Sequence, residues 1–262
     1  MTLSLKSRVI ISIIIVSAVI AVATVQVCAM EGYAAKPRFC HTSNELVNYF
    51  LEQAGNREQY ISVAIPDDLP EAGMTEAALL TYILRKDSGF VRWGCKSVGP
   101  VLKTKESGYT AFYYTMQYYT TKEQDDAAKA YASAIAEKLA VEGLSGNQKM
   151  DRLKNFITAN WRYDSSHKNV TAYSTMTSGK GTCLGLVIAS KLILEEMGIP
   201  SQTIHGEVEG VEGHHIMLLV KADGIWYTFD PTELARPKPM TSYYMKKRIG
   251  AGFTPCAEYY MV

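Results

Sequence analysis

The chain has 262 residues, of which 47% are hydrophobic and 20% are charged, an ordinary balance for a globular protein. This length is sufficient for one large domain or two smaller ones with a sizeable core. The 27 Lys and Arg residues almost equal the 26 Asp and Glu residues, and the net charge is +1. Because no long run of basic residues accompanies this balance, no nucleic-acid partner is expected.

The N-terminus has the pattern of a targeting segment. Lys6 and Arg8 precede an apolar run from Val9 to Val27, and Val27-Cys28-Ala29 has the small residues of a signal-peptidase site. We predict that residues 1–29 are a signal peptide, or an uncleaved membrane anchor because the apolar run approaches the length of a membrane span. Under both alternatives the protein is secreted or anchored to the outer face of the cytoplasmic membrane.

Residues 30–142 are predicted to form an N-terminal α/β region of unknown role. Periodicity and turn residues predict a linker over 31–41, helices over 45–53, 75–84 and 122–142, and strands over 60–65, 90–98 and 109–120. The first helix is expected to be capped by Thr42-Ser43-Asn44. The last is expected to start with a capping box that involves Thr120-Thr121 and Glu123-Gln124.

Residues 143–262 are predicted to form a second domain. Its expected elements are a helix over 145–160, a polar loop over 165–177, a helix from Cys183 to Met197, and strands over 202–208, 215–220, 225–229 and around 256–261. The dipeptide Asp223-Gly224 between two of these strands is a strong hairpin signal.

Five cysteines occur, at positions 28, 40, 95, 183 and 256, and four follow the targeting segment. Export permits disulfides. The pairing among Cys40, Cys95 and Cys256 is left open, with a preference for Cys40–Cys95 because both lie in the same half of the chain. A chain in which all four were paired would block Cys183.

Cys183 is predicted to start a helix. A turn of Gly179-Lys180-Gly181-Thr182 precedes it, and apolar residues recur behind it at helical spacing. The N–H groups at a helix N-terminus and the helix dipole favour a thiolate over a thiol, which makes Cys183 a candidate nucleophile. The alternative is a small apolar residue in a buried helix end.

His215 and Asp230 are predicted to lie at one end of a sheet. The first starts one strand and the second follows the next, and in an antiparallel hairpin these two ends are neighbours. If the helix of Cys183 packs on this sheet with its N-terminus at the same end, the three residues meet as nucleophile, base and orienting carboxylate. The alternatives are a surface pair, His214 with His215, and a turn residue at Asp230.

Several segments between about 145 and 235 resemble the transglutaminase-like superfamily. They are Trp161-Arg162-Tyr163-Asp164, Ala172-Tyr173, Gly179-Lys180-Gly181-Thr182-Cys183-Leu184-Gly185, His215, and Asp223-Gly224-Ile225-Trp226-Tyr227-Thr228-Phe229-Asp230-Pro231-Thr232. The resemblance implies an α+β fold with a papain-like core, in which a helix that bears the Cys packs on an antiparallel sheet that bears the His and the Asp. It also implies Cys183 as nucleophile, His215 as base and Asp230 as orienting acid.

The resemblance implies exported, thiol-dependent acyl transfer on protein or peptide amides, with substrates that include cell-envelope peptides. An amine acceptor gives cross-linking, and water gives peptidase or amidase hydrolysis. The family's Ala-Trp-Asn after the His is here Ile216-Met217-Leu218, so an inactive domain that serves as a cell-surface binding module is the alternative. The sequence contains neither a calcium-loop pattern nor a metal-ligand set, and no cofactor is expected.

Overall fold

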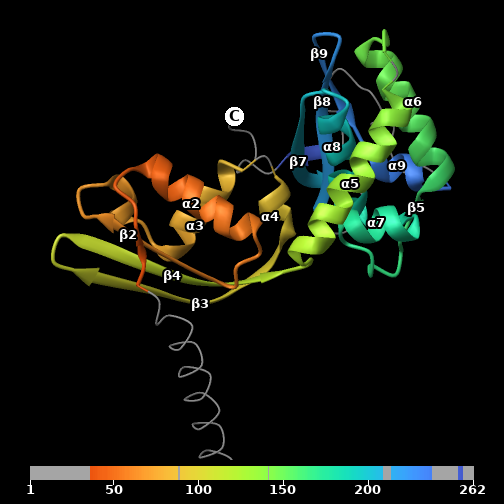
Figure 1. The fold of residues 1–262 in the computed structure, drawn as a ribbon. Coiled ribbons are helices and arrows are strands. Elements are labelled where there is room, and N and C mark those ends of the chain that lie inside the picture. Colours follow the sequence, from red (N-terminus) through yellow and green to blue (C-terminus); the bar gives the residue numbers. More distant parts are fainter. Residues whose placement is uncertain (1–35, 88, 141, 209–213, 238–252, 256–262) are drawn as a thin grey trace, which may run out of the picture. The chain divides into compact units, whose positions relative to one another are not determined.

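The computed structural model describes residues 36–87, 89–140, 142–208, 214–237 and 253–255 (Figure 1). The chain divides into two compact units. One contains the described residues up to Ile83 together with 97–117, and the other contains 84–96 and the described residues from Tyr118 onward. The predicted targeting segment over 1–29 and the predicted strand around 256–261 lie outside the described residues.

No helix within the described residues is both long enough and apolar enough to span a bilayer.

The first unit is a four-stranded sheet with helices. The strand order is β1-β2-β4-β3, with β1 (Arg38–Phe39) parallel to β2 (Tyr60–Pro66) and β2 antiparallel to β4 (Tyr109–Tyr118); β3 spans Cys95–Glu106. The helical elements are α2 (Ser43–Gly55), η1 (Pro70–Gly73) and α3 (Glu76–Arg85). Strands β2 and β4 and both α-helices confirm the predictions, including the cap at Thr42, whose side chain accepts the N–H of Glu45.

Tyr114 joins both helices to this sheet. Its ring meets Phe50 of α2 edge-on, with the ring centroids 5.3 Å apart, and its hydroxyl donates to the carbonyl of Glu76 at the start of α3 over 2.9 Å. Tyr114 is fully buried, so this hydrogen bond satisfies a polar group that would otherwise be costly to bury.

The predicted strand over 90–98 is wrong in its first half. Residues Phe90–Gly94 form the short helix α4, and β3 starts only at Cys95 and continues to Glu106. The reason lies just before the helix, where the carboxylate of Asp87 accepts the N–H groups of Gly89 and Arg92 over 2.9 Å each. Gly89 has a φ of 107°, which favours glycine, and it turns the chain into the helix.

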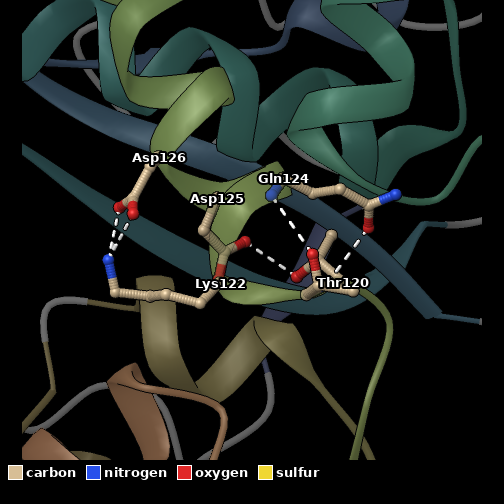
Figure 2. Close-up of polar contacts among 6 residues, drawn as sticks. Thr120, Lys122, Gln124, Asp125 and Asp126 are labelled. Carbon is tan, nitrogen blue, oxygen red and sulfur yellow. Dashed lines mark hydrogen bonds and ion pairs between the residues drawn. The ribbon is translucent and has the colours of Figure 1, made fainter.

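Helix α5 (Lys122–Leu139) starts with the predicted capping box, formed by Thr121 and Gln124. Figure 2 shows this start, where the hydroxyl of Thr120 also donates to Asp125 and Lys122 forms an ion pair with Asp126 one turn on. In the capping box, the side-chain oxygens of Thr121 and Gln124 accept backbone N–H groups that a helix start leaves without intrahelical partners.

The second unit contains six α-helices and a second sheet among its described residues. The helices are α4, α5, α6 (Gly146–Asn160), α7 (Ala172–Ser178), α8 (Cys183–Glu196) and α9 (Pro231–Ala235). The sheet is antiparallel, in the order β10-β7-β8-β9, with β7 at Ser201–Val208, β8 at His214–Ala222, β9 at Ile225–Phe229 and β10 at Phe253–Pro255. A small parallel pair joins β5 (Arg162–Tyr163) to β6 (Lys180–Gly181). The mixed α+β class is confirmed.

Helix α8 is the centre of the second unit. Every residue from Gly185 to Leu194 is buried, as expected for a helix that is apolar on nearly all sides. It packs against α5, α7, α9 and strand β8 (Figure 1). Buried alanines of α5 such as Ala132 share its core, so the structure groups α5 with the second unit, whereas the predicted boundary at 142/143 placed this helix in the N-terminal region.

The predicted loop over 165–177 is wrong at its end, because α7 starts at Ala172. The helix is capped by Thr171, whose hydroxyl accepts the N–H of Ser174, and it ends at Gly179, which has a φ of 68°. The polar composition of the segment concealed the capping spacing of Thr171 and Ser174.

The segment 84–96 is held in the second unit by β7. The indole N–H of Trp93 donates to the hydroxyl of Thr203 over 3.2 Å, and the Trp93 ring lies 5.7 Å from the ring of His205. The positive charge of Lys129 on α5 lies 4.8 Å from the ring centroid of Phe90.

Candidate active site

Cys183 is the first residue of α8, as predicted. Thr182 caps the helix: its carbonyl accepts the N–H of Leu186 over 2.9 Å, and its hydroxyl accepts the N–H of Gly185 over 3.5 Å. The side chain of Cys183 is half-buried and its thiol is free. Cys40 is also a free cysteine, so the preferred Cys40–Cys95 bridge is absent; its buried thiol donates to the carbonyl of Arg38 over 3.8 Å.

Close packing explains why glycine occupies the positions two residues before and two residues after Cys183. A Cβ atom at Gly185 would lie 2.5 Å from the hydroxyl oxygen of Thr175 and 2.9 Å from the carbonyl oxygen of Asn169. A Cβ atom at Gly181 would collide with the same Thr175 hydroxyl. The Gly-x-Cys-x-Gly spacing therefore allows α7 and the preceding loop to pack directly against the start of α8.

We expect Gly185→Ala to destabilise the second unit by about 1–3 kcal/mol, because the new methyl group meets backbone carbonyls that cannot rotate away. The measurement is urea unfolding followed by tryptophan fluorescence, since all three tryptophans lie in this unit. Gly73→Ala in the first unit, where nothing lies within 4 Å of the Cβ position, is the control for an added methyl group that has space, and its unfolding is followed by circular dichroism. An unchanged midpoint for Gly185→Ala would contradict the close packing described above.

His215 and Asp230 form a hydrogen-bonded pair between β8 and the residue that follows β9. The Nε2 atom of His215 lies 2.7 Å from Oδ2 of Asp230. Asp230 is fully buried, and the side chain of His215 is 13% exposed. The second carboxylate oxygen accepts the N–H of Thr232 over 2.9 Å, so Asp230 also caps α9 and is held in one orientation.

The electrostatics of His215 connect it to Cys183. Burial lowers the pKa of His215, but its hydrogen bonds with Asp230 and Cys183 and the electrostatic interactions with both raise it, to about 10 overall. Since Nε2 bonds Asp230, the other ring nitrogen, Nδ1, is the one available to the thiol. The pKa of His215 thus responds to both Asp230 and Cys183, and the catalytic roles of the three residues stay a prediction.

The neighbouring histidine is arranged differently. The ring of His214 lies 4.8 Å from that of His205 on β7 and is exposed. Of the two adjacent histidines, His215 is therefore the one that bonds the buried carboxylate. Among the described residues, no group of three or more His, Cys, Asp and Glu side chains is placed to hold a metal ion.

Sequence reasoning missed the residues that support the start of α8. Thr175 lies against Gly181 and Gly185, and the carbonyl of Asn169 accepts the N–H of Thr182 over 2.8 Å. Both belong to the stretch interpreted as a loop. The capping spacing of Thr171 and Ser174 could have placed Thr175 on a helix, but its contact with α8 depends on tertiary structure.

Comparisons with known proteins give one family. Residues 129–231 match the family described as the transglutaminase-like superfamily. A search of the curated proteins finds no match.

Solved structures also match the chain, at low identity. The crystal structure of a TGase is 15% identical, with 75% of this chain and 59% of that chain covered and a TM-score of 0.38. A candidate cysteine protease from Cytophaga hutchinsonii is 15% identical, with 54% and 66% covered and a TM-score of 0.36. The periplasmic domain of TgpA from Pseudomonas aeruginosa is 13% identical, with 53% and 62% covered and a TM-score of 0.36. The match spans less than two thirds of each of these three chains.

Proposed function

We propose, from the match of residues 129–231 to the transglutaminase-like superfamily, that the protein catalyses thiol-dependent acyl transfer on protein or peptide amides. The observation that supports the proposal is the 2.7 Å contact between His215 and the buried Asp230, together with the rise that Cys183 and Asp230 cause in the pKa of His215. In the proposed roles, Cys183 is the nucleophile, His215 the general base and acid, and Asp230 the group that orients the imidazole.

The reaction begins with the proton shared by Cys183 and His215. Because the pKa of His215 is raised to about 10, the imidazole holds a proton near neutral pH, and its positive charge favours the thiolate of Cys183. The thiolate attacks the amide carbonyl and forms a C–S bond. His215 then donates its proton to the amine nitrogen as the C–N bond breaks, which leaves a thioester and a neutral imidazole.

The thioester is resolved by an acceptor. The neutral His215 takes a proton from an amine or a water molecule as that group attacks the thioester carbonyl, and the thiolate leaves. An amine gives a new amide and thus a cross-link, whereas water gives a carboxylate and thus hydrolysis. The backbone N–H of Cys183, in the first turn of α8, has no intrahelical acceptor, and we assign it to the oxyanion of the intermediate.

We propose that this chemistry takes place outside the cytoplasm, on protein or cell-envelope peptide. The support is the basic and apolar pattern of residues 1–29 in the sequence. In this proposal the N-terminal segment directs secretion or anchors the protein to the outer face of the cytoplasmic membrane.

The test is incubation of the protein with a glutamine-containing protein and a labelled primary amine, followed by mass spectrometry. Amine incorporation identifies a transglutaminase, and cleavage or deamidation identifies a hydrolase. Either product is expected to be lost in Cys183→Ser and kept in Cys95→Ser, the matched control. Full activity in Cys183→Ser would overturn the proposal, and the absence of any product together with slow alkylation of Cys183 would favour the binding module.

A further inference from the structure

We propose that Asp164 is a positioning residue for Cys183, because it holds the loop 164–169 that supports the start of α8. The inference rests on the proposed function, since it concerns the reactivity of the same thiol. Asp164 follows β5 and belongs to the Trp161-Arg162-Tyr163-Asp164 segment, for which the mechanism above has no use.

The carboxylate of Asp164 is the centre of the loop. Its Oδ1 accepts the N–H and the hydroxyl of Ser166 over 3.0 and 2.6 Å. Its Oδ2 accepts the N–H of Lys168 over 3.1 Å, and the N–H and the side-chain amide of Asn169 over 2.9 and 2.8 Å. Asp164 is itself only 6% exposed, so its negative charge is compensated by these five donors rather than by bulk water.

These donors change the pKa of Asp164. The hydrogen bonds from Ser166 and Asn169 outweigh burial and hold the pKa of Asp164 well below its usual range. The loop is therefore built around the ionised carboxylate at every pH at which a thiol enzyme would operate.

The loop is bonded to the two residues that precede Cys183. The backbone N–H of Asp164 donates to the carbonyl of Gly181 over 2.9 Å, as part of the parallel pair β5–β6. The N–H of Thr182, the helix cap, donates to the carbonyl of Asn169 over 2.8 Å. The position of Thr182, and with it the first turn of α8, thus depends on Asn169, which Asp164 holds through two hydrogen bonds.

A carboxylate fits this position better than an amide. An Asn side chain offers one acceptor oxygen, and its NH₂ group would face N–H donors that now bond the second carboxylate oxygen. At least two of the five hydrogen bonds would be lost, and the support for Thr182 would loosen. Because a misplacement of about 1 Å can lower a reaction rate by about 10²-fold, a small shift of Cys183 relative to His215 has a measurable effect.

The experiment compares the full-length protein with its Asp164→Asn variant, by the rate of alkylation of Cys183 with iodoacetamide from pH 5 to 9. We expect alkylation about 10- to 100-fold slower at pH 7 and a pH–rate profile displaced to higher pH, since the thiolate loses the well-placed imidazolium. Circular dichroism would establish that the variant is folded. Asp126→Asn, which removes an exposed carboxylate paired with Lys122, is the matched control and is expected to stay within twofold of the wild type.

A folded Asp164→Asn variant with the wild-type rate and the wild-type pH profile would overturn the proposal, because a merely structural role leaves the thiol of the folded protein unchanged. If Asp164→Asn does not fold, Ser166→Ala removes only one of the five donors and is expected to give a smaller decrease of the same kind. A wild-type rate and profile in that variant would count equally against the proposal.

Alkylation needs no amide substrate, so the two proposals fail separately. A wild-type protein that alkylates fast without turning over any amide would contradict the proposed function alone.

Discussion

The His215→Ala variant is expected to turn over amide substrates on the order of 10⁴-fold more slowly than the wild type. In the proposed mechanism the imidazole of His215, whose pKa is raised to about 10, carries the proton for both Cys183 and the leaving amine. Without it the thiol loses its positively charged neighbour and the leaving group its acid. The measurement is amide turnover together with the rate of Cys183 alkylation at pH 7, which is expected to fall to that of an ordinary cysteine.

The adjacent histidine provides the control. His214→Ala removes a ring that lies against His205 rather than against the Asp230 carboxylate, so turnover within a few-fold of the wild type is expected. Equal losses in the two variants would mean that the effect comes from disturbance of β8 and not from the proton carrier.

The second large effect is expected in Asp230→Asn, as a loss of stability of about 3–5 kcal/mol near pH 7, because the substitution leaves a buried imidazolium without its counter-charge. The folded-state pKa of His215, about 10, lies above the ordinary value of 6.5. The stabilisation is therefore complete below about pH 6.5 and is lost as the pH rises through about 10. In the variant this slope should be smaller, since only Cys183 then still raises the pKa of His215.

Chemical denaturation at a series of pH values measures this effect. The Cys183→Ala background removes the contribution of Cys183 to the pKa of His215, so that the remaining slope comes from the His215–Asp230 pair. His215→Gln in the same background should also abolish the slope. The variant that combines His215→Gln with Asp230→Asn should be little less stable than either single variant, since both substitutions remove the same interaction. A wild-type slope in Asp230→Asn would show that another group carries it.

The parts of the fold that follow from local signals were predictable from the sequence. Thr182 caps α8, and Asp223-Gly224, with φ values of 49° and 81°, closes the β8–β9 hairpin as its sequence indicates. From the hairpin alone, His215 and Asp230 had to lie at one end of the sheet, and their 2.7 Å contact agrees with that.

The parts that depend on distant contacts were not predictable in this way. Helix α4 is the exception with a local cause: Asp87 accepts the N–H groups of Gly89 and Arg92, whereas the apolar residues of 90–98 taken alone are compatible with a strand. The Asp164 loop needs the pairing of β5 with β6, which joins residues far apart in the chain. Helix α5, which the predicted boundary at 142/143 places in the N-terminal region, falls in the second compact unit, since its buried alanines share a core with α8.

The segment 84–96 also has a consequence for how the chain folds. The hydrogen bond from Trp93 to Thr203 closes a separation of 110 residues, and the intervening chain includes 97–117, which belong to the first unit. Contacts of such long range form late, because the entropy of the open loop must be lost before they stabilise anything. During synthesis the first unit can therefore be complete before β7 is available to Trp93, a stage at which the Trp93 ring is exposed to solvent and to chaperones.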